Sequence, residues 1–285
     1  MSTPLARQAL CLCGSSYSNV DCLALRLREM TKSRALQVYP DMTLAMYAAA
    51  LVGACCLGLS KSGFPGLALI NVLLMAELFG AKESVGIILP LLIAGDLTVY
   101  PLFRKYASWS QVWPIIVPAV FGVLIGYALF GRIDNQAARR VIGAIVLIMI
   151  ALYLLETYGK QFLERVRDSG LFHWGAGLSM GVSTMMANAA GPIYSVYALV
   201  RRMPKTNFLG IGARYYLFVN LVKVPFMTEL DIINRNSLTL NVALLPGVLV
   251  GVFLGRALIA KVPQKLFEIL LCIFSIVAGG RFLFF

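Results

Sequence analysis

Long apolar runs separated by short polar gaps fill the chain from Thr43 onward. A helix needs about 20 mainly apolar residues to cross the hydrocarbon core of a bilayer. Most runs approach that length alone, and two are interrupted partway by polar residues. The pattern predicts an all-α, polytopic membrane protein of about eight transmembrane elements: Thr43–Leu59 continued by Leu67–Phe79, Ser84–Phe103, Val112–Phe130, Ala138–Leu155, Leu171–Ala187 continued by Pro192–Val200, Phe208–Met227, Leu240–Ile259 and Leu266–Phe285.

The first and fifth elements are broken by Gly, Pro and polar residues. Backbone groups without helical partners do not face lipid and persist only inside protein or beside water. Both interruptions are therefore expected to point into the protein, as broken or re-entrant helices.

The chain also matches itself at a nearly constant spacing. Gly122 and Gly126 recur 129 positions later as a second Gly-x-x-x-Gly pair, Gly58 recurs at Gly181 after 123 positions, and Asp96 corresponds to Asn220 after 124. This order of matches indicates two internally repeated halves, each opening with a broken helix. The predicted organisation is an N-terminal cytoplasmic tail (1–42), a first transmembrane repeat (43–156), a polar connector (157–170) and a second transmembrane repeat (171–285).

Composition narrows the class of protein. With 59% hydrophobic and 13% charged residues, the chain is too apolar for an ordinary soluble enzyme. The formal net charge of +12 fits basic cytoplasmic loops or attraction of an anion. Nucleic acid is not an expected partner, because the basic residues are scattered singly among apolar runs. The six cysteines form no C-x-x-C motif, so no metal site is predicted. No Walker or dinucleotide-binding motif appears, so no cofactor is predicted.

The first break combines hydroxyls, an ammonium and flexible backbone. Ser60, Lys61, Ser62 and Gly63 lie in it, and Lys61 is expected at the start of a new half-helix. A helix start with free N–H groups and a nearby positive charge suits an oxyanion. The alternative is a short loop outside the membrane with a surface lysine.

The second break offers small residues and an amide. Ser183, Thr184, Asn188 and Gly191 are candidates for contacting a solute, with Asn188 either hydrogen-bonding it or capping a half-helix. The alternative is ordinary helix packing with an N-cap.

Four polar residues within later spans are candidates for coupling or gating. Asp96 lies in the middle of a span, where a carboxylate is costly. Its repeat mate Asn220 is neutral, and Lys223 follows on the same helical face. Arg214 either binds an anion or extends to the interface. The alternative for Asp96 is a structural contact with a lysine or serine.

An intramembrane hydrolase is the enzymatic alternative. The segment from Gly177 to Gly181 fits the G-x-S-x-G pattern around Ser179, and His173 lies six residues away. No strand precedes the motif, and small residues in a spanning helix produce such matches readily. No catalytic residue is therefore predicted.

Duplicated halves that open with broken helices are typical of secondary transporters, whose sites lie where the repeats meet. The prediction is a carrier of a small anion that works by alternating access in the cell (inner) membrane, with the solute and the lipid bilayer as partners. An anion channel without coupling is the nearest alternative. The sequence leaves open the transport direction, the coupling ion, the orientation of the repeats, and whether the chain forms a homo-oligomer.

Several stretches resemble the sulfite exporter TauE/SafE family of membrane transporters. They are Gly58-Leu-Ser-Lys-Ser-Gly-Phe-Pro-Gly66, Leu89-Pro-Leu-Leu-Ile-Ala-Gly-Asp96, Ala187-Asn-Ala-Ala-Gly-Pro192, Val219-Asn-Leu-Val-Lys-Val-Pro-Phe226 and the two Gly-x-x-x-Gly helices. The resemblance covers about residues 43–285, although the triple glycine usual at the family's breaks is missing here. It implies transport, with a sulfur oxyanion or an organosulfonate as the solute.

Overall fold

The computed structural model describes residues 42–79, 81–130, 169–233 and 235–284, with a few single residues between 132 and 151. Three sequence predictions lie outside these residues: the tail before Met42, the span at Ala138–Leu155, and nearly all of the connector at 157–170.

The described part of the chain is all-helical, as predicted. Its elements are α3 (Leu44–Lys61), α4 (Leu67–Phe79), α5 (Ala81–Phe103), the short 3₁₀ helix η1 (Arg104–Tyr106), α6 (Trp109–Phe130), α9 (Gly170–Ala187), α10 (Ala190–Val200), α11 (Lys205–Glu229), α12 (Arg235–Lys261) and α13 (Gln264–Phe284). Both predicted interruptions are present, between α3 and α4 and between α9 and α10.

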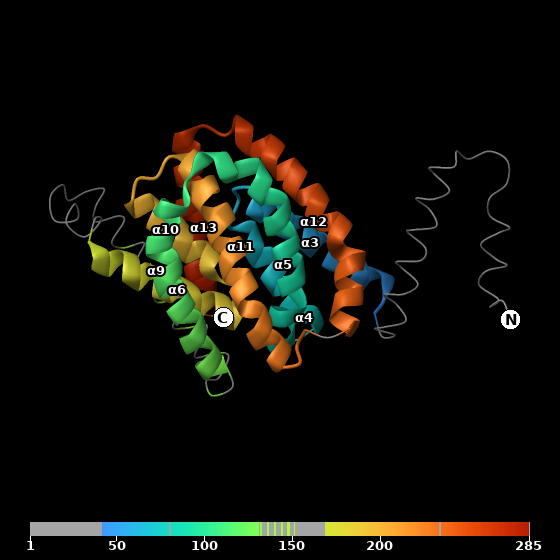
Figure 1. Ribbon diagram of the computed structural model, residues 1–285. Coiled ribbons are helices and arrows are strands. Elements are labelled where there is room, and N and C mark those ends of the chain that lie inside the picture. The colour runs from blue at the N-terminus through green and yellow to red at the C-terminus, as the bar shows by residue number, and fades with distance from the viewer. Residues whose placement is uncertain are drawn as a thin grey trace, which may run out of the picture.

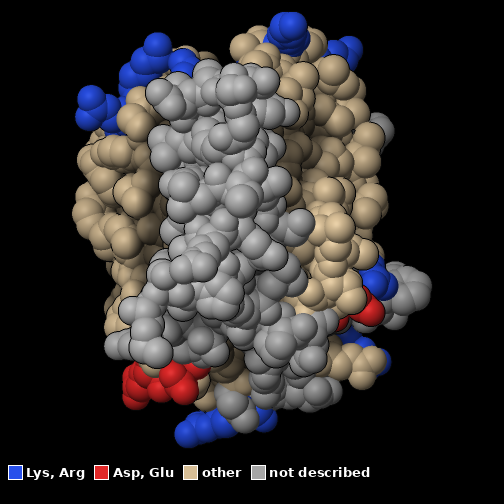
Figure 2. All heavy atoms as spheres, turned by 90° about the vertical axis from the view of Figure 1, so that its right-hand side faces the viewer, with Lys and Arg blue, Asp and Glu red and all other residues tan. Residues whose placement is uncertain are grey.

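Four described helical stretches are long and apolar enough to cross a membrane: Leu44–Lys61, Ser84–Tyr106, Trp109–Phe130 and Ser237–Lys261. Shorter apolar helices, such as Ala190–Val200, accompany them. On the face shown in Figure 2, the described charged side chains gather toward two opposite ends, and an uncharged band lies between them. This distribution is the one expected when lipid surrounds the middle of the molecule.

The helices are arranged around a central pair. Helices α5 and α11 pack against each other in the middle of the molecule, with α3 and α12 on one side and α6 and α9 on the other (Figure 1). Helices α3 and α12 form one closely packed pair, and α6 and α9 form another. Each pair joins a helix from before the connector to a helix from after it.

Glycines allow these two pairs to approach closely. A Cβ atom on Gly58 of α3 would lie 2.9 Å from the Cα of Gly251 in α12, and one on Gly122 of α6 would lie 2.9 Å from the Cα of Gly181 in α9. Both are closer than side-chain atoms pack, so the backbones touch only because these positions lack side chains.

The two breaks end their helices differently. Helix α3 ends at Lys61, and the chain turns at Gly63, whose φ of +121° is a conformation that only glycine adopts readily. Helix α9 ends at Ala187, and the next residue, Asn188, takes the left-handed conformation with φ 51°. One sequence expectation is wrong here, because Lys61 ends a helix rather than starting one. Asn188 does cap a helix, but it is the end of α9 and not the start of α10, so the N-cap of the alternative reading is not found.

Candidate functional site

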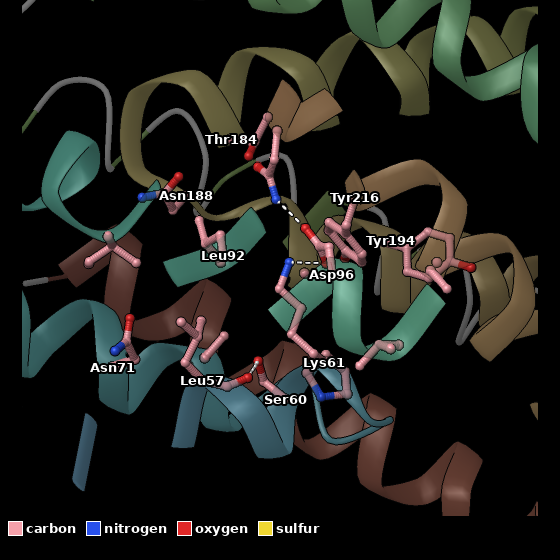
Figure 3. A pocket seen from close by; sticks show the side chains of 18 of the residues that line it. Leu57, Ser60, Lys61, Asn71, Leu92, Asp96, Thr184, Asn188, Tyr194 and Tyr216 are labelled. Atoms are coloured by element: carbon pink, nitrogen blue, oxygen red, sulfur yellow. Dashed lines mark hydrogen bonds and ion pairs between the residues drawn. The ribbon is translucent and has the colours of Figure 1, made fainter. Parts of the chain in front are cut away.

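One cavity of about 60 Å³ lies where the two breaks meet the central helices. A water molecule needs about 10–15 Å³ of such space, so the cavity has room for a few waters or one small solute. Most of its wall is apolar. The polar lining residues are Ser60, Lys61, Asn71, Asp96, Thr184, Asn188, Tyr194, Tyr216 and Asn220, most of them visible in Figure 3.

Both breaks contribute to this cavity. Pro65 of the first break and Asn188 of the second line it, and so do Ala68 in the first turn of α4 and Gly191 in the first turn of α10. The prediction that both interruptions point into the protein is therefore confirmed. The amino-terminal ends of two half-helices, which carry partial positive charge, meet at this cavity.

A buried ion pair lies on one side of the cavity. Lys61 Nζ is 2.6 Å from Asp96 Oδ1, and the two side chains are 7% and 1% exposed. Asn220 Nδ2 donates to the other carboxylate oxygen, Oδ2, at 2.7 Å (Figure 3). Both oxygens of Asp96 are thus occupied, and its charge is neutralised by Lys61. The lysine also lies over the ring of Tyr216, 4.7 Å from the ring centroid.

A second buried lysine holds the end of α9. Lys223 is completely buried, and its Nζ donates to the backbone oxygen of Thr184 at 2.7 Å and to Asn188 Oδ1 at 2.6 Å. The Thr184 hydroxyl lies 3.4 Å from the same nitrogen. Asn188 in turn donates through Nδ2 to the backbone oxygen of Val85 in α5 at 3.0 Å. Lys223 does not line the cavity itself, but it fixes two residues that do.

The charges around the cavity are unequal. Within the described residues, two ammonium groups (Lys61 and Lys223) are buried here against one carboxylate (Asp96). None of the contacts of Lys223 described above is to a carboxylate. Burial of a charge is costly unless an opposite charge offsets it. The arrangement is therefore suited to a negatively charged occupant.

Two neutral polar groups in the cavity wall have no hydrogen-bond partner among the described residues. Both amide atoms of Asn71 are buried and unpaired, and so is the hydroxyl of Tyr216. A buried polar group without a partner is destabilising, which points to a partner that arrives with an occupant or with water.

Sequence reasoning did not identify Asn71 or Tyr216 as site residues. Asn71 had a detectable signal, because it is the one polar residue in the apolar stretch from Leu67 to Ala76. Tyr216 had none, since aromatic residues are common in membrane helices.

Seven of the predicted site residues line the cavity: Ser60, Lys61, Asp96, Thr184, Asn188, Gly191 and Asn220. The structure brings them together from five helices and both breaks. The alternative that Asp96 makes a contact with a lysine between helices is confirmed, and the lysine is Lys61, from a helix that sequence spacing does not link to α5.

Five predicted residues lie outside the cavity lining: Lys223, described above, and Ser62, Gly63, Ser183 and Arg214. Ser62 donates to the backbone oxygen of Val252 at 2.8 Å and joins α3 to α12. Gly63 forms the turn beside Leu209 and Ile259. Ser183 donates to Met180 within α9. These three contacts hold the breaks in place.

Arg214 also lies away from the cavity lining, against η1. Its guanidinium donates to the backbone oxygens of Arg104 at 2.6 Å and of Gly210 at 3.2 Å. The rings of Tyr100 and Trp109 are each 5.7 Å from it. These contacts join α11 to the end of α5.

The G-x-S-x-G segment lies inside the continuous helix α9. A Cβ on Gly177 would lie 2.8 Å from the backbone oxygen of Ile115, and Gly181 packs on Gly122. Both glycines therefore serve the contact of α9 with α6. The nucleophile of a hydrolase needs a sharp turn after a strand, and this segment provides none.

Comparison with family models gives a match to one described as "Sulfite exporter TauE/SafE", over residues 37–282. No curated protein matches the chain, and no solved structure does. The family match covers both breaks, both lysines and most of the chain.

Proposed function

Because the chain belongs to the sulfite exporter TauE/SafE family, whose members are membrane transporters, we propose that it is a secondary transporter of a small anion. The solute is a sulfur oxyanion or an organosulfonate, held in the cavity between the two breaks. The protein works by alternating access as a multi-pass protein of the cell (inner) membrane.

The observation that carries the proposal is the excess of positive charge at the cavity. Lys61 and Lys223 are both buried, and one carboxylate, Asp96, stands against them among the described residues. A monovalent anion restores neutrality and offsets the cost of burying the second ammonium. The half-helix starts at α4 and α10 add partial positive charge at the same cavity.

The unpaired polar groups complete the solute site in this proposal. Asn71 offers an amide N–H and a carbonyl oxygen, and Tyr216 offers a hydroxyl. An oxyanion accepts hydrogen bonds from such donors while its charge interacts with the lysines. Ser60, Thr184 and Asn188 are the remaining polar contacts.

The lining of the cavity supports an internal duplication. At a spacing of 123 positions, Lys61 corresponds to Thr184, Pro65 to Asn188, Ala68 to Gly191 and Asn71 to Tyr194. At a spacing of 124, Ile88 corresponds to Gly212, Leu92 to Tyr216 and Asp96 to Asn220. All fourteen residues of these pairs line the cavity.

The two closely packed helix pairs, α3 with α12 and α6 with α9, also fit this duplication. The opening helix of each half, α3 or α9, packs on the Gly-x-x-x-Gly helix of the other half, α12 or α6. The site then lies on the pseudo-two-fold axis of two repeats, next to the contact of Asp96 with Asn220. Rocking of one pair of helices against the other opens the cavity to alternate sides.

The test is solute counterflow with the purified full chain in proteoliposomes. Vesicles loaded with unlabelled sulfite should accumulate external radiolabelled sulfite, because a carrier exchanges solute faster than it moves it in one direction. Uptake of methanesulfonate tests whether the solute is an organosulfonate. Flux without this stimulation by internal solute would identify an anion channel, and no flux of either anion would contradict the proposed function.

Lys205 provides a matched control for the lysines of the site. It lies outside the cavity lining and donates to the backbone oxygens of Ile259 and Val262, at 3.1 Å and 2.5 Å. Lys205→Gln removes one positive charge and its hydrogen bonds to backbone oxygens, as Lys223→Gln does. We expect counterflow to fall with Lys223→Gln and to persist with Lys205→Gln.

A further inference from the structure

The contacts of Lys223 suit a protonated amine. Three oxygen atoms surround Nζ: the backbone and hydroxyl oxygens of Thr184 and Oδ1 of Asn188. An ammonium has three N–H donors and no lone pair, so it can offer a proton to each oxygen. The two short contacts are to a carbonyl oxygen and an amide oxygen, which only accept, and the Thr184 hydroxyl can accept the third N–H.

The carboxylate of Asp96 cannot neutralise both lysines by direct contact. Oδ1 pairs with Lys61 and Oδ2 accepts from Asn220. Arg214 adds no charge to the lining, because it is held against η1 by backbone oxygens and aromatic rings. With Lys223 protonated, the cavity therefore has one unit of positive charge in excess among the described residues.

We propose that the cavity selects solutes with a single negative charge over solutes with two. The inference rests on the proposed function and specifies its substrate class. A monoanion makes the buried site neutral. A dianion leaves one negative charge uncompensated among mostly apolar walls, and such a charge is costly away from water. Sulfonates and hydrogen sulfite belong to the favoured class, and sulfate to the disfavoured one.

The experiment measures how methanesulfonate and sulfate compete with counterflow of radiolabelled sulfite at one fixed pH. Methanesulfonate carries one charge and sulfate two, on groups of similar size and shape. The two anions differ in hydration, but this difference is the same for every protein variant. It cancels when the ratio of inhibitory concentrations is compared between variants.

Asp96→Asn raises the net charge of the cavity by one unit and keeps the shape of the side chain. We expect the preference for sulfate relative to methanesulfonate to rise at least tenfold, since one unit charge at contact distance acts strongly in a protein interior. The double variant Asp96→Asn with Lys61→Gln returns the cavity to a single excess charge. Its preference should return toward that of the wild type.

Two further variants separate charge from other effects. Lys223→Gln makes the cavity neutral, so inhibition by methanesulfonate should weaken about tenfold and inhibition by sulfate more than that, because a dianion loses twice the electrostatic attraction. The Lys223→Gln variant also tests selection by charge if Asp96→Asn does not fold. Lys205→Gln, which removes a lysine outside the lining, should leave the ratio unchanged.

The outcomes distinguish this inference from the proposed function. If both anions compete and their ratio is the same in the wild type, Asp96→Asn and Lys223→Gln, selection by charge is overturned while anion transport stands. A wild type that prefers sulfate also overturns it. If neither anion competes and sulfite itself is not transported, the proposed function fails as well.

Discussion

The two breaks differ most clearly in where each obtains its positive charge. In the first break, Lys61 belongs to the helix that ends there and is neutralised by Asp96. In the proposed duplication, the corresponding position in the second break is Thr184, whose backbone oxygen accepts a hydrogen bond from Lys223 of α11. Both lysines lie at the carboxyl end of a helix, where a cation is favourable.

In the proposed duplication, this difference is how two similar halves form one asymmetric site. The first half supplies a neutral ion pair and an unpaired amide, that of Asn71. The second half supplies the unneutralised ammonium, and its counterpart of Asn71 is Tyr194, whose hydroxyl already donates to Phe208 at 2.7 Å. A solute therefore meets hydrogen-bonding capacity on one side and excess charge on the other.

The largest effects, on folding itself, are expected at the two close helix contacts, where the two parts of the chain are most alike. Gly58→Leu and Gly181→Leu each place a side chain against the backbone of a neighbouring helix, which a packed interface cannot accommodate. We expect neither variant to yield folded protein in detergent by size-exclusion chromatography.

Gly175→Leu is the matched control, because a Cβ atom there meets nothing within 4 Å. This variant should elute as the wild type does. Normal folding of either Gly58→Leu or Gly181→Leu would contradict the equivalence of the two interfaces.

Lys61→Gln should give the largest loss of transport in a folded protein, at least about 100-fold. It removes a cation from the cavity wall and leaves Asp96 as an unpaired negative charge that repels the solute. The loss of transport is measured as counterflow normalised to the amount of reconstituted protein. Adding Asp96→Asn should recover part of the activity, and an equally inactive double variant would argue against charge as the cause.

Lys223→Gln should have a smaller effect on transport, about tenfold, because the lysine lies behind Thr184 and Asn188. The loss should exceed that of Lys205→Gln in the same counterflow assay. If Lys223→Gln impairs transport more than Lys61→Gln, the roles assigned to the two lysines are reversed.

The smallest effects on solute binding and stability are expected for substitutions of Asn71 and Tyr194. Asn71→Leu should weaken solute binding severalfold and raise the thermal stability of the free protein, because it removes an unpaired buried amide. Tyr194→Phe should leave binding unchanged and cost about 1 kcal/mol of stability through its lost hydrogen bond.

Melting curves with and without methanesulfonate measure both quantities. A destabilising Asn71→Leu variant would show that the amide is already satisfied in the free protein.

Much of the fold was predictable because lipid imposes a strong pattern on the sequence. The apolar runs predict α5, α6 and α12 to within a few residues of their ends, and Gly and Pro predict both breaks. The spacing of the matches also singled out Asp96 and Asn220 as equivalent positions. That the two residues touch was not predictable, since equivalence in a repeat does not fix the position of the axis.

The partners of the buried charges could not be predicted. Lys61 and Asp96 are 35 positions apart on different helices, and their contact depends on how α3 packs against α5. Lys223 and Asn188 are likewise 35 positions apart, and their contact depends on the left-handed turn at the end of α9. Sequence periodicity describes one helix at a time and contains no information on such crossings.

The most direct measurement is the position of a bound monoanion in crystals of the full chain soaked in bromomethanesulfonate. The anomalous signal of bromine locates the solute independently of any assay. We expect one peak in the cavity between Lys61 and Asn188, lost in Lys61→Gln. A peak in the separate cavity lined by His173, Tyr197 and Arg201, with none between the breaks, would contradict the assignment of the site.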